Sequence, residues 1–186
     1  MPSTVDSHEP LTMSGRVQVV VAHPDDETFG CGSLLLHARA AGATTAVCCA
    51  TRGEAGGTGA DLGAVREREL REAAAVLGVD HVDLLGFLDS GMSGPAAPAT
   101  LVGAPVVDVT ASVRAAVDAF GPDVLVTLDA SDGHRDHARI RDVTIAVARP
   151  ASARSACTPH RPPRTTACRR TCGGRSWPTC TCARWT

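Results

Sequence analysis

Four short apolar runs, each followed by a stretch with helical periodicity, constrain the fold more than any other feature of this sequence. The runs have strand length and many β-branched residues, and they cover residues 16–22, 44–51, 81–86 and 123–128. Helices are predicted for the stretches that follow, at residues 28–41, 62–77, 105–120 and 135–148. This alternation predicts a Rossmann-like, three-layer α/β fold with a mainly parallel sheet covered on both faces.

The loops that follow the first and fourth predicted strands are where we expect the chemistry. Open parallel sheets bind ligands beyond the carboxyl ends of their strands, near the point where the strand order reverses. If the order is 3-2-1-4, the strands at residues 16–22 and 123–128 are neighbours at that point. Their loops would then meet at one site.

Charge divides the chain into two unlike parts. Residues 1–142 contain all 20 acidic residues and ten of the 18 Arg, whereas residues 143–186 contain eight Arg and no acid. The acidic body argues against a nucleic-acid partner, because binding phosphates needs a basic face. The absence of Lys and the dominance of Arg are typical of codon bias in a GC-rich, actinobacterial type of genome.

The two ends of the chain differ from its centre. The first fifteen residues are polar, so we expect a flexible segment before a domain at residues 16–149. They contain no apolar stretch typical of a secretory signal, and no run approaches the roughly 20 apolar residues that span a bilayer. We therefore expect a cytoplasmic protein with no membrane partner. Cys31, Cys48 and Cys49 have the apolar surroundings of reduced core thiols.

The first loop of interest reads AHPDDE at residues 22–27. Two adjacent carboxylates and an imidazole at the end of a buried strand are costly unless a cation lies beside them. His23 and Asp26 can converge on one metal as nitrogen and oxygen ligands, while Asp25 points elsewhere. The loop therefore indicates half of a metal site.

The second loop reads DGHRDH at residues 132–137, where a helix is predicted to begin. His134 and His137 are three residues apart and can present two nitrogens toward one site. The alternative is that these residues are only a helix cap and solvated polar groups. Together with the first loop they favour a metal site, because a His–Asp–His set with an open position suits catalytic zinc.

The AHPDDE loop and the later H-x-D-H motif resemble the LmbE/PIG-L family of zinc-dependent N-deacetylases. That family includes deacetylases of N-acetylglucosaminyl-inositol compounds and mycothiol-conjugate amidases, and the similarity covers about residues 16–148. The resemblance implies a hydrolase that removes an acyl group from an N-acyl amino sugar or a similar small amide. It also implies a Zn²⁺ cofactor, with Fe²⁺ as the alternative in cells.

The resemblance also assigns roles to individual residues. The implied zinc ligands are His23, Asp26 and His137. Asp25 would be the general base that activates water, and His134, oriented by Asp136, would stabilise the oxyanion and assist the leaving amine. Family members often have Pro where this chain has Arg135, which is not a ligand position.

Weaker signals concern the substrate. Arg66 matches a family position near the substrate, although it could equally lie on a solvated helix face, which is the interpretation favoured for Glu69. Asp89, which begins the sequence DSGM, resembles the family's substrate-hydroxyl loop, or else forms an ordinary turn. Glu54 could support the surroundings of the metal.

The C-terminal part of the chain departs from the family. Family members continue past the second motif with further strands and helices, so we expect a C-terminally truncated fold. Residues 150–186 contain no Val, Ile, Leu, Met or Phe, which predicts disorder, and their composition is that of GC-rich DNA read out of frame. The spacing of Cys168, Cys172, Cys180 and Cys182 argues against a structural zinc site. Two functions stay open: an active metal-dependent amide hydrolase, or a catalytically impaired remnant that binds metal and sugar.

Overall fold

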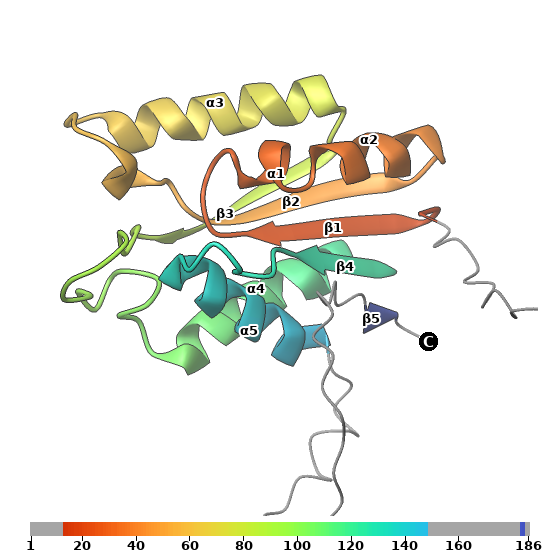
Figure 1. Ribbon diagram of the computed structural model, residues 1–186. Helices are drawn as coiled ribbons and strands as arrows, with labels where there is room; N and C mark the ends of the chain where they lie inside the picture. Colours follow the sequence, from red (N-terminus) through yellow and green to blue (C-terminus); the bar gives the residue numbers. More distant parts are fainter. Residues whose placement is uncertain (1–12, 149–182, 185–186) are drawn as a thin grey trace, which may run out of the picture.

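The computed structural model describes residues 13–148 and 183–184, and Figure 1 shows their arrangement. The strands are β1 (Arg16–Val21), β2 (Thr44–Thr51), β3 (His81–Phe87), β4 (Val124–Thr127) and β5 (Ala183–Arg184). The helices are α1 (Asp26–Phe29), α2 (Gly32–Ala40), α3 (Leu62–Leu77), α4 (Val106–Phe120) and α5 (Arg135–Ala148), with a 3₁₀ turn η1 (Glu54–Gly56). The α/β alternation is confirmed, but the single helix expected at residues 28–41 is wrong, because the chain forms α1 and α2 there.

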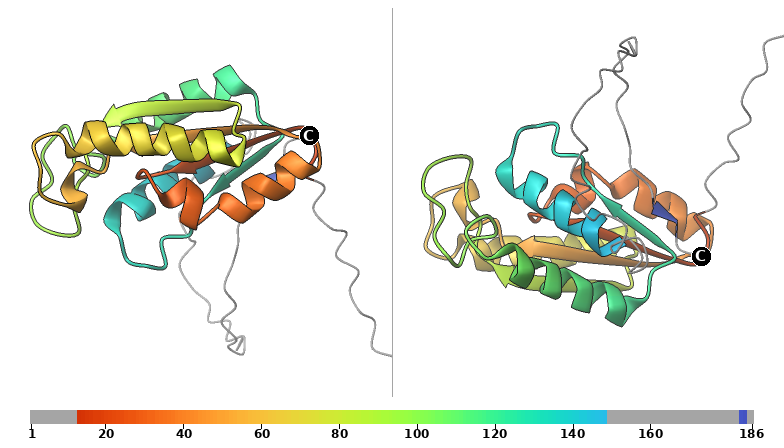
Figure 2. Two further views of the ribbon diagram at one scale, coloured as in Figure 1. Left: turned by 90° about the horizontal axis from the view of Figure 1, so that it is seen from above. Right: turned by 90° about the horizontal axis from the view of Figure 1, so that it is seen from below.

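The sheet has the order β3-β2-β1-β4-β5. β1 pairs in parallel with both β2 and β4, and β2 pairs in parallel with β3. The expected 3-2-1-4 order is therefore confirmed, and the carboxyl ends of β1 and β4 are neighbours. Helices α1, α2 and α3 cover one face of the sheet and α4 and α5 cover the other (Figures 1 and 2).

Both faces of β1 are buried, which explains why its sequence is apolar apart from Arg16 at its start and the fully buried Gln18. Val19 and Val21 pack with Leu35 of α2 and Leu70 of α3. On the other face, Val20 packs in the cluster that contains α4 and α5 residues. Because both faces are packed, the register of β1 in the sheet is fixed, and so is the position of the loop that follows it.

The cysteines expected in the core are buried and reduced. Cys48 and Cys49 are neighbours in β2 and join different core clusters, one on each side of the sheet. Burial raises the pKa of the Cys48 thiol to about 12 and that of Cys49 well above its ordinary value. Both thiols are therefore protonated at neutral pH and serve as small apolar side chains.

The two ends bear on what was expected of them. Met13 is buried in a cluster with Val17 and Ala43, so the expectation of a flexible segment is wrong at this residue. β5 pairs antiparallel with β4, so Ala183 and Arg184 differ from the irregular tail expected there. The other expectations for residues 1–12, 149–182 and 185–186, including the frameshift and the tail cysteines, lie outside the described residues. Among the described helices, none combines the length and hydropathy that a bilayer crossing requires.

Asp80 ties the end of α3 to the sheet, and its removal should destabilise the fold. Its carboxylate accepts hydrogen bonds from the backbone N–H (2.8 Å) and the hydroxyl (3.4 Å) of Thr45, and it pairs with Arg39 at 3.1 Å. We expect Asp80→Ala to lower the free energy of unfolding by about 1 kcal/mol at neutral pH, because the buried Thr45 N–H loses its acceptor. Urea titration measures the change, with the exposed Asp83→Ala as the control.

The same contacts give this contribution a pH dependence. The Thr45 N–H, followed by Arg39, lowers the pKa of Asp80 from its ordinary value of 3.8. The folded protein therefore gains stability from Asp80 above pH 3.8 and loses the gain as the pH falls through the lowered pKa. The difference between the parent and Asp80→Ala should shrink in acid, and a difference that grows in acid would contradict this account.

Candidate metal and catalytic site

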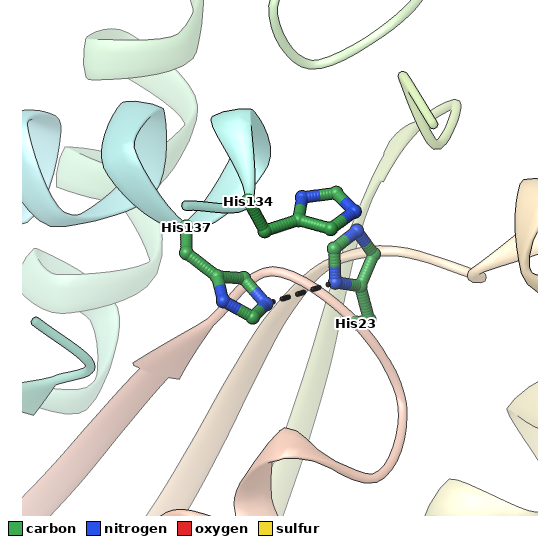
Figure 3. Close-up of side chains that lie close together, drawn as sticks. All are labelled: His23, His134 and His137. Carbon is green, nitrogen blue, oxygen red and sulfur yellow. Dashed lines mark hydrogen bonds between the residues drawn. The ribbon is translucent and has the colours of Figure 1, made fainter. Parts of the chain in front are cut away.

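The loops after β1 and β4 meet at the carboxyl end of the sheet, where the strand order predicts a site. Figure 3 shows that His23, from the loop after β1, faces His134 and His137 at the start of α5. The ring centroid of His23 lies 4.6 Å from that of His134 and 5.1 Å from that of His137. The fold thus brings together side chains that are more than 110 positions apart.

The three expected metal ligands form a triangle of nitrogen and oxygen atoms. His23 Nδ1 lies 3.2 Å from His137 Nε2, and Asp26 Oδ2 lies 3.3 Å from His137 Nε2 and 3.7 Å from His23 Nδ1. Tetrahedral zinc with bonds of about 2.0–2.1 Å keeps its ligand atoms about 3.3 Å apart. The donor set and its spacing therefore fit one such ion.

Two other groupings of side chains also have the spacing of metal ligands. One consists of His23, His134 and His137, and the other of His23, Asp89 and Asp136. Within each group the candidate ligand atoms lie within 4.8 Å of one another. Both groups share His23, so the three arrangements are competing positions for one ion around the same imidazole.

Each histidine of the triangle has a carboxylate at its other ring nitrogen. His23 Nε2 lies 3.2 Å from Asp136 Oδ2, and His137 Nδ1 lies 2.6 Å from Asp132 Oδ2. Such contacts place the ring proton on the outer nitrogen and leave the inner nitrogen free to bind a metal. The sequence did not predict this role of Asp132. Its only signal was that Asp132 lies five residues before the candidate ligand His137.

The carboxylates also govern the charge of the cluster. Burial alone would lower the pKa of His23, but Asp136, Asp89 and Asp26 together raise it to about 9. A hydrogen bond with Asp26 raises the pKa of His137 above its ordinary value, against burial. Metal binding at this cluster must therefore displace protons from the imidazoles.

The contacts of Asp136 differ from the expected one. Its carboxylate binds His23 and accepts a hydrogen bond from the Ser90 N–H at 2.9 Å, rather than reaching the ring of His134. The backbone N–H of Asp136 instead donates to His134 Nδ1 at 3.2 Å. In the neutral ring, His134 then carries its proton on Nε2, which becomes a hydrogen-bond donor. Burial, followed by the charges of His23 and His137, lowers the pKa of His134.

Asp25 lies beside the triangle in an unusual backbone conformation. Its φ is +96°, a region that non-glycine residues rarely adopt, and Glu27 Oε2 accepts its N–H at 2.9 Å. Arg66 donates to Asp25 Oδ2 at 2.9 Å and also binds the carbonyls of Pro24 and Gly53. Burial raises the pKa of Asp25, although Arg66 opposes the shift. These contacts hold a half-exposed carboxylate in place.

Some residues around Asp25 make contacts that the sequence analysis did not predict. The fully buried Glu27 accepts a hydrogen bond from the Asp25 N–H, and its role was not predicted. Its position after two aspartates was the only signal in the sequence. Arg66 reaches the Asp25 carboxylate in addition to facing a cavity of about 220 Å³. Glu69 is exposed, as expected for a solvated helix face, and it also lines this cavity.

Asp89 lies on the other side of His23. Its Oδ1 is 3.6 Å from His23 Nε2 and accepts the Gly91 N–H at 2.8 Å. Burial opposes ionisation, but the bonds from His23 and Gly91 hold the pKa of Asp89 below its ordinary value. Glu54 Oε2 accepts the Asp89 N–H at 3.2 Å, so Glu54 supports this loop rather than touching the triangle.

Comparison with known proteins places these features in a wider context. The family model described as GlcNAc-PI de-N-acetylase (PIG-L) matches residues 18–148. A 1D-myo-inositol 2-acetamido-2-deoxy-alpha-D-glucopyranoside deacetylase of Mycolicibacterium gilvum is 38% identical over 151 residues, which cover 70% of this chain and 53% of the relative. The corresponding deacetylase of Actinosynnema mirum is 37% identical and is covered to 56%, with 73% of this chain. The chain spans about half the length of the curated relatives it matches.

Solved structures share the fold. A conserved protein from Thermus thermophilus superposes with a TM-score of 0.57 and 31% identity, covering 71% of this chain and 54% of its own. An N,N'-diacetylchitobiose deacetylase from Pyrococcus horikoshii gives a TM-score of 0.61 at 24% identity, covering 72% of this chain and 49% of its own. At 24% identity, the similarity to the Pyrococcus horikoshii deacetylase shows a shared fold alone.

Proposed function

Because the chain belongs to the PIG-L (GlcNAc-PI de-N-acetylase) family, we propose that it is a metal-dependent hydrolase that deacetylates an N-acyl amino sugar. The observation that carries the proposal is the triangle of His23 Nδ1, Asp26 Oδ2 and His137 Nε2, together with the Asp25 carboxylate, whose charge interacts with those of Asp26 and His23. The substrate class is supported by relatives named for deacetylating an acetamido-glucopyranoside of inositol.

Zinc is the cofactor that we propose, held by His23, Asp26 and His137. Two imidazoles and one carboxylate form a donor set typical of catalytic zinc, and the same set also accepts iron. When bound, such an ion polarises the acyl carbonyl and lowers the pKa of water to about 7. The residues around it would supply the remaining steps.

Asp25 would act as the general base. Its carboxylate is half-exposed beside the triangle, and burial raises its pKa toward the range in which a carboxylate accepts a proton efficiently. The proton taken from the attacking water is the one that the leaving nitrogen needs, so hydrolysis of the amide is balanced within the site. Arg66 and Glu27 would keep the carboxylate aimed at the water during both transfers.

His134 would stabilise the oxyanion. Its Nδ1 accepts the Asp136 N–H, so Nε2–H of the neutral ring is free to donate to the acyl oxygen as negative charge develops there. The lowered pKa keeps the ring neutral at physiological pH. Asp89, which lies beside His23, and Arg66, which binds Asp25, would contact the sugar.

The proposal is tested on the purified chain by two measurements. Calorimetry measures Zn²⁺ binding, and a primary-amine assay measures product release from N-acetylglucosaminyl-inositol with and without the metal. Metal-dependent amine release supports the proposal. Zinc binding without release favours the alternative of a catalytically impaired binding protein, and the absence of zinc binding contradicts both.

Asp132 offers a sharper test of the metal position. We expect Asp132→Ala to weaken Zn²⁺ binding by about 10- to 100-fold, because His137 Nδ1 loses the carboxylate that orients the ring. Calorimetric titration measures the affinity. Asp129→Ala is the matched control in the same loop, because the Asp129 carboxylate accepts the Ser131 N–H at the surface and does not bind a histidine of the triangle. Equal affinities of the two variants would show that Asp132 does not orient a ligand.

A further inference from the structure

The guanidinium group of Arg135 binds three backbone carbonyls of one loop. Its Nε donates to Gly91 O at 2.7 Å, Nη1 donates to Gly94 O at 2.7 Å, and Nη2 donates to Ser93 O at 3.2 Å. We call residues 91–94 the clamped loop. It follows β3, whereas Arg135 begins α5, so one side chain joins two segments that are more than 40 positions apart in the sequence.

The clamped loop has little else to hold its shape. Within the described part of the chain, no other hydrogen bond reaches the backbone of residues 92–96. Gly91 and Gly94 have φ values of +61° and +88°, in the region that favours glycine. Glycine loses more conformational entropy on ordering than other residues, so an ordered loop of this kind needs specific contacts. Arg135 supplies them.

The clamped loop is continuous with the proposed site. Directly before it, the Ser90 N–H donates to Asp136 Oδ2, and Asp89 Oδ1 lies 3.6 Å from His23 Nε2. Arg135 and Asp136 are adjacent residues that hold adjacent parts of the same segment. A shift of the loop would therefore move Asp89 and Ser90 relative to the triangle of metal ligands.

We propose that Arg135 is a positioning residue that fixes the clamped loop as a wall of the substrate site and thereby sets affinity for the amino sugar. The inference rests on the proposed function for its substrate. A guanidinium presents five N–H donors in a rigid plane and can bind three carbonyls at once, whereas a lysine ammonium carries its donors on one nitrogen. Arginine is therefore required at this position, and lysine is an inadequate replacement.

The experiment compares Arg135→Ala and Arg135→Lys with Arg141→Ala. Arg141 lies on the same helix but binds Asp142 and the Asp129 carbonyl, so it is a matched control that leaves the loop untouched. Amide hydrogen exchange is measured at Ser90 and Gly91, whose N–H groups are bonded at the start of the loop. Calorimetry measures zinc affinity and the Kd of glucosamine, an amine product that is not turned over, and kinetics give KM and kcat.

In Arg135→Ala, we expect amide exchange at Ser90 and Gly91 to rise about tenfold, because the loop opens more often. The glucosamine Kd and the KM should rise about tenfold with kcat within about threefold, as for lost substrate binding. Arg135→Lys should recover only part of the loss, and zinc affinity should stay at the parental value throughout. A purely structural arginine would lower stability without moving Kd or KM.

Unchanged exchange in Arg135→Ala would overturn the proposal, and so would a fall in kcat at constant KM and Kd. Arg141→Ala must behave as the parent, because otherwise the effect belongs to the helix and the proposal fails. If the parent releases no amine, the proposed function fails, while exchange and glucosamine binding still decide the role of Arg135.

Discussion

Replacement of His137 by alanine is expected to weaken zinc binding by more than about a hundredfold, which exceeds the loss typical when a residue that only orients a ligand is removed. The variant loses one of the three proposed ligand atoms, His137 Nε2, which lies 3.2–3.3 Å from the other two. Amine release should fall with the metal. Calorimetry measures the binding, and thermal unfolding provides a second readout, because an ion that binds only the folded state raises the Tm.

His37→Ala is the control, because this exposed histidine of α2 lies on another part of the surface. Its zinc affinity and its zinc-induced rise in Tm should equal those of the parent. Comparing the zinc affinities of His137→Ala and Asp89→Ala distinguishes the competing ion positions around His23. If His137→Ala keeps its zinc affinity while Asp89→Ala loses it, the ion lies on the Nε2 side of His23 and the proposed triangle is wrong.

Asp25→Asn should reduce kcat by at least about 100-fold while zinc affinity stays within about threefold, since a general base contributes 10²–10⁴-fold and is not a ligand. Asparagine keeps the shape of the side chain and an oxygen for Arg66, so the fold around φ +96° should survive. Steady-state amine release and zinc calorimetry separate the two effects. Asp61→Asn, at an exposed position before α3, is the matched control.

The parent should also show the pH dependence of this base. Asp25 must be ionised to accept a proton, and burial raises its pKa, so kcat/KM should decline as the pH falls through that raised pKa. In Asp25→Asn the acidic limb should disappear from the residual activity. Near-parental turnover of Asp25→Asn would refute the assignment of the base, and parental turnover of His134→Ala would refute that of the oxyanion donor.

The strand order and the site position could be predicted from the sequence because both follow from short-range patterns. The runs at β1 and β4 are mostly apolar and lack strict alternation, which is typical of strands buried on both faces. Once the two strands are neighbours, their loops must meet, so His23 and His137 come together without any knowledge of side-chain conformation. The closeness of the two loops that carry the proposed triangle follows from this backbone rule.

The parts that could not be predicted depend on three-dimensional packing. One is the break between α1 and α2, where Gly30, the C-cap of α1, packs against Leu128, a neighbour almost 100 residues away. Another is the partner of Asp136, because the direction of a carboxylate at a helix start is set by its rotamer. The Asp136 carboxylate binds His23 and Ser90. Arg135, which is not a ligand position of the family, binds the clamped loop.

The parallel pairing of β1 with β4 also has a consequence for the order of folding. Arg16 N–H bonds Asp123 Oδ2 at the start of this pairing, across 107 positions of the chain, so a large loop-closure entropy must be overcome before the two strands meet. The β1–β2–β3 half can form from nearer neighbours and contains His23 and Asp26, but not His137. A nascent or partly folded chain would therefore hold two of the three proposed ligands, and tight, specific binding of an ion would mark the completed long-range topology.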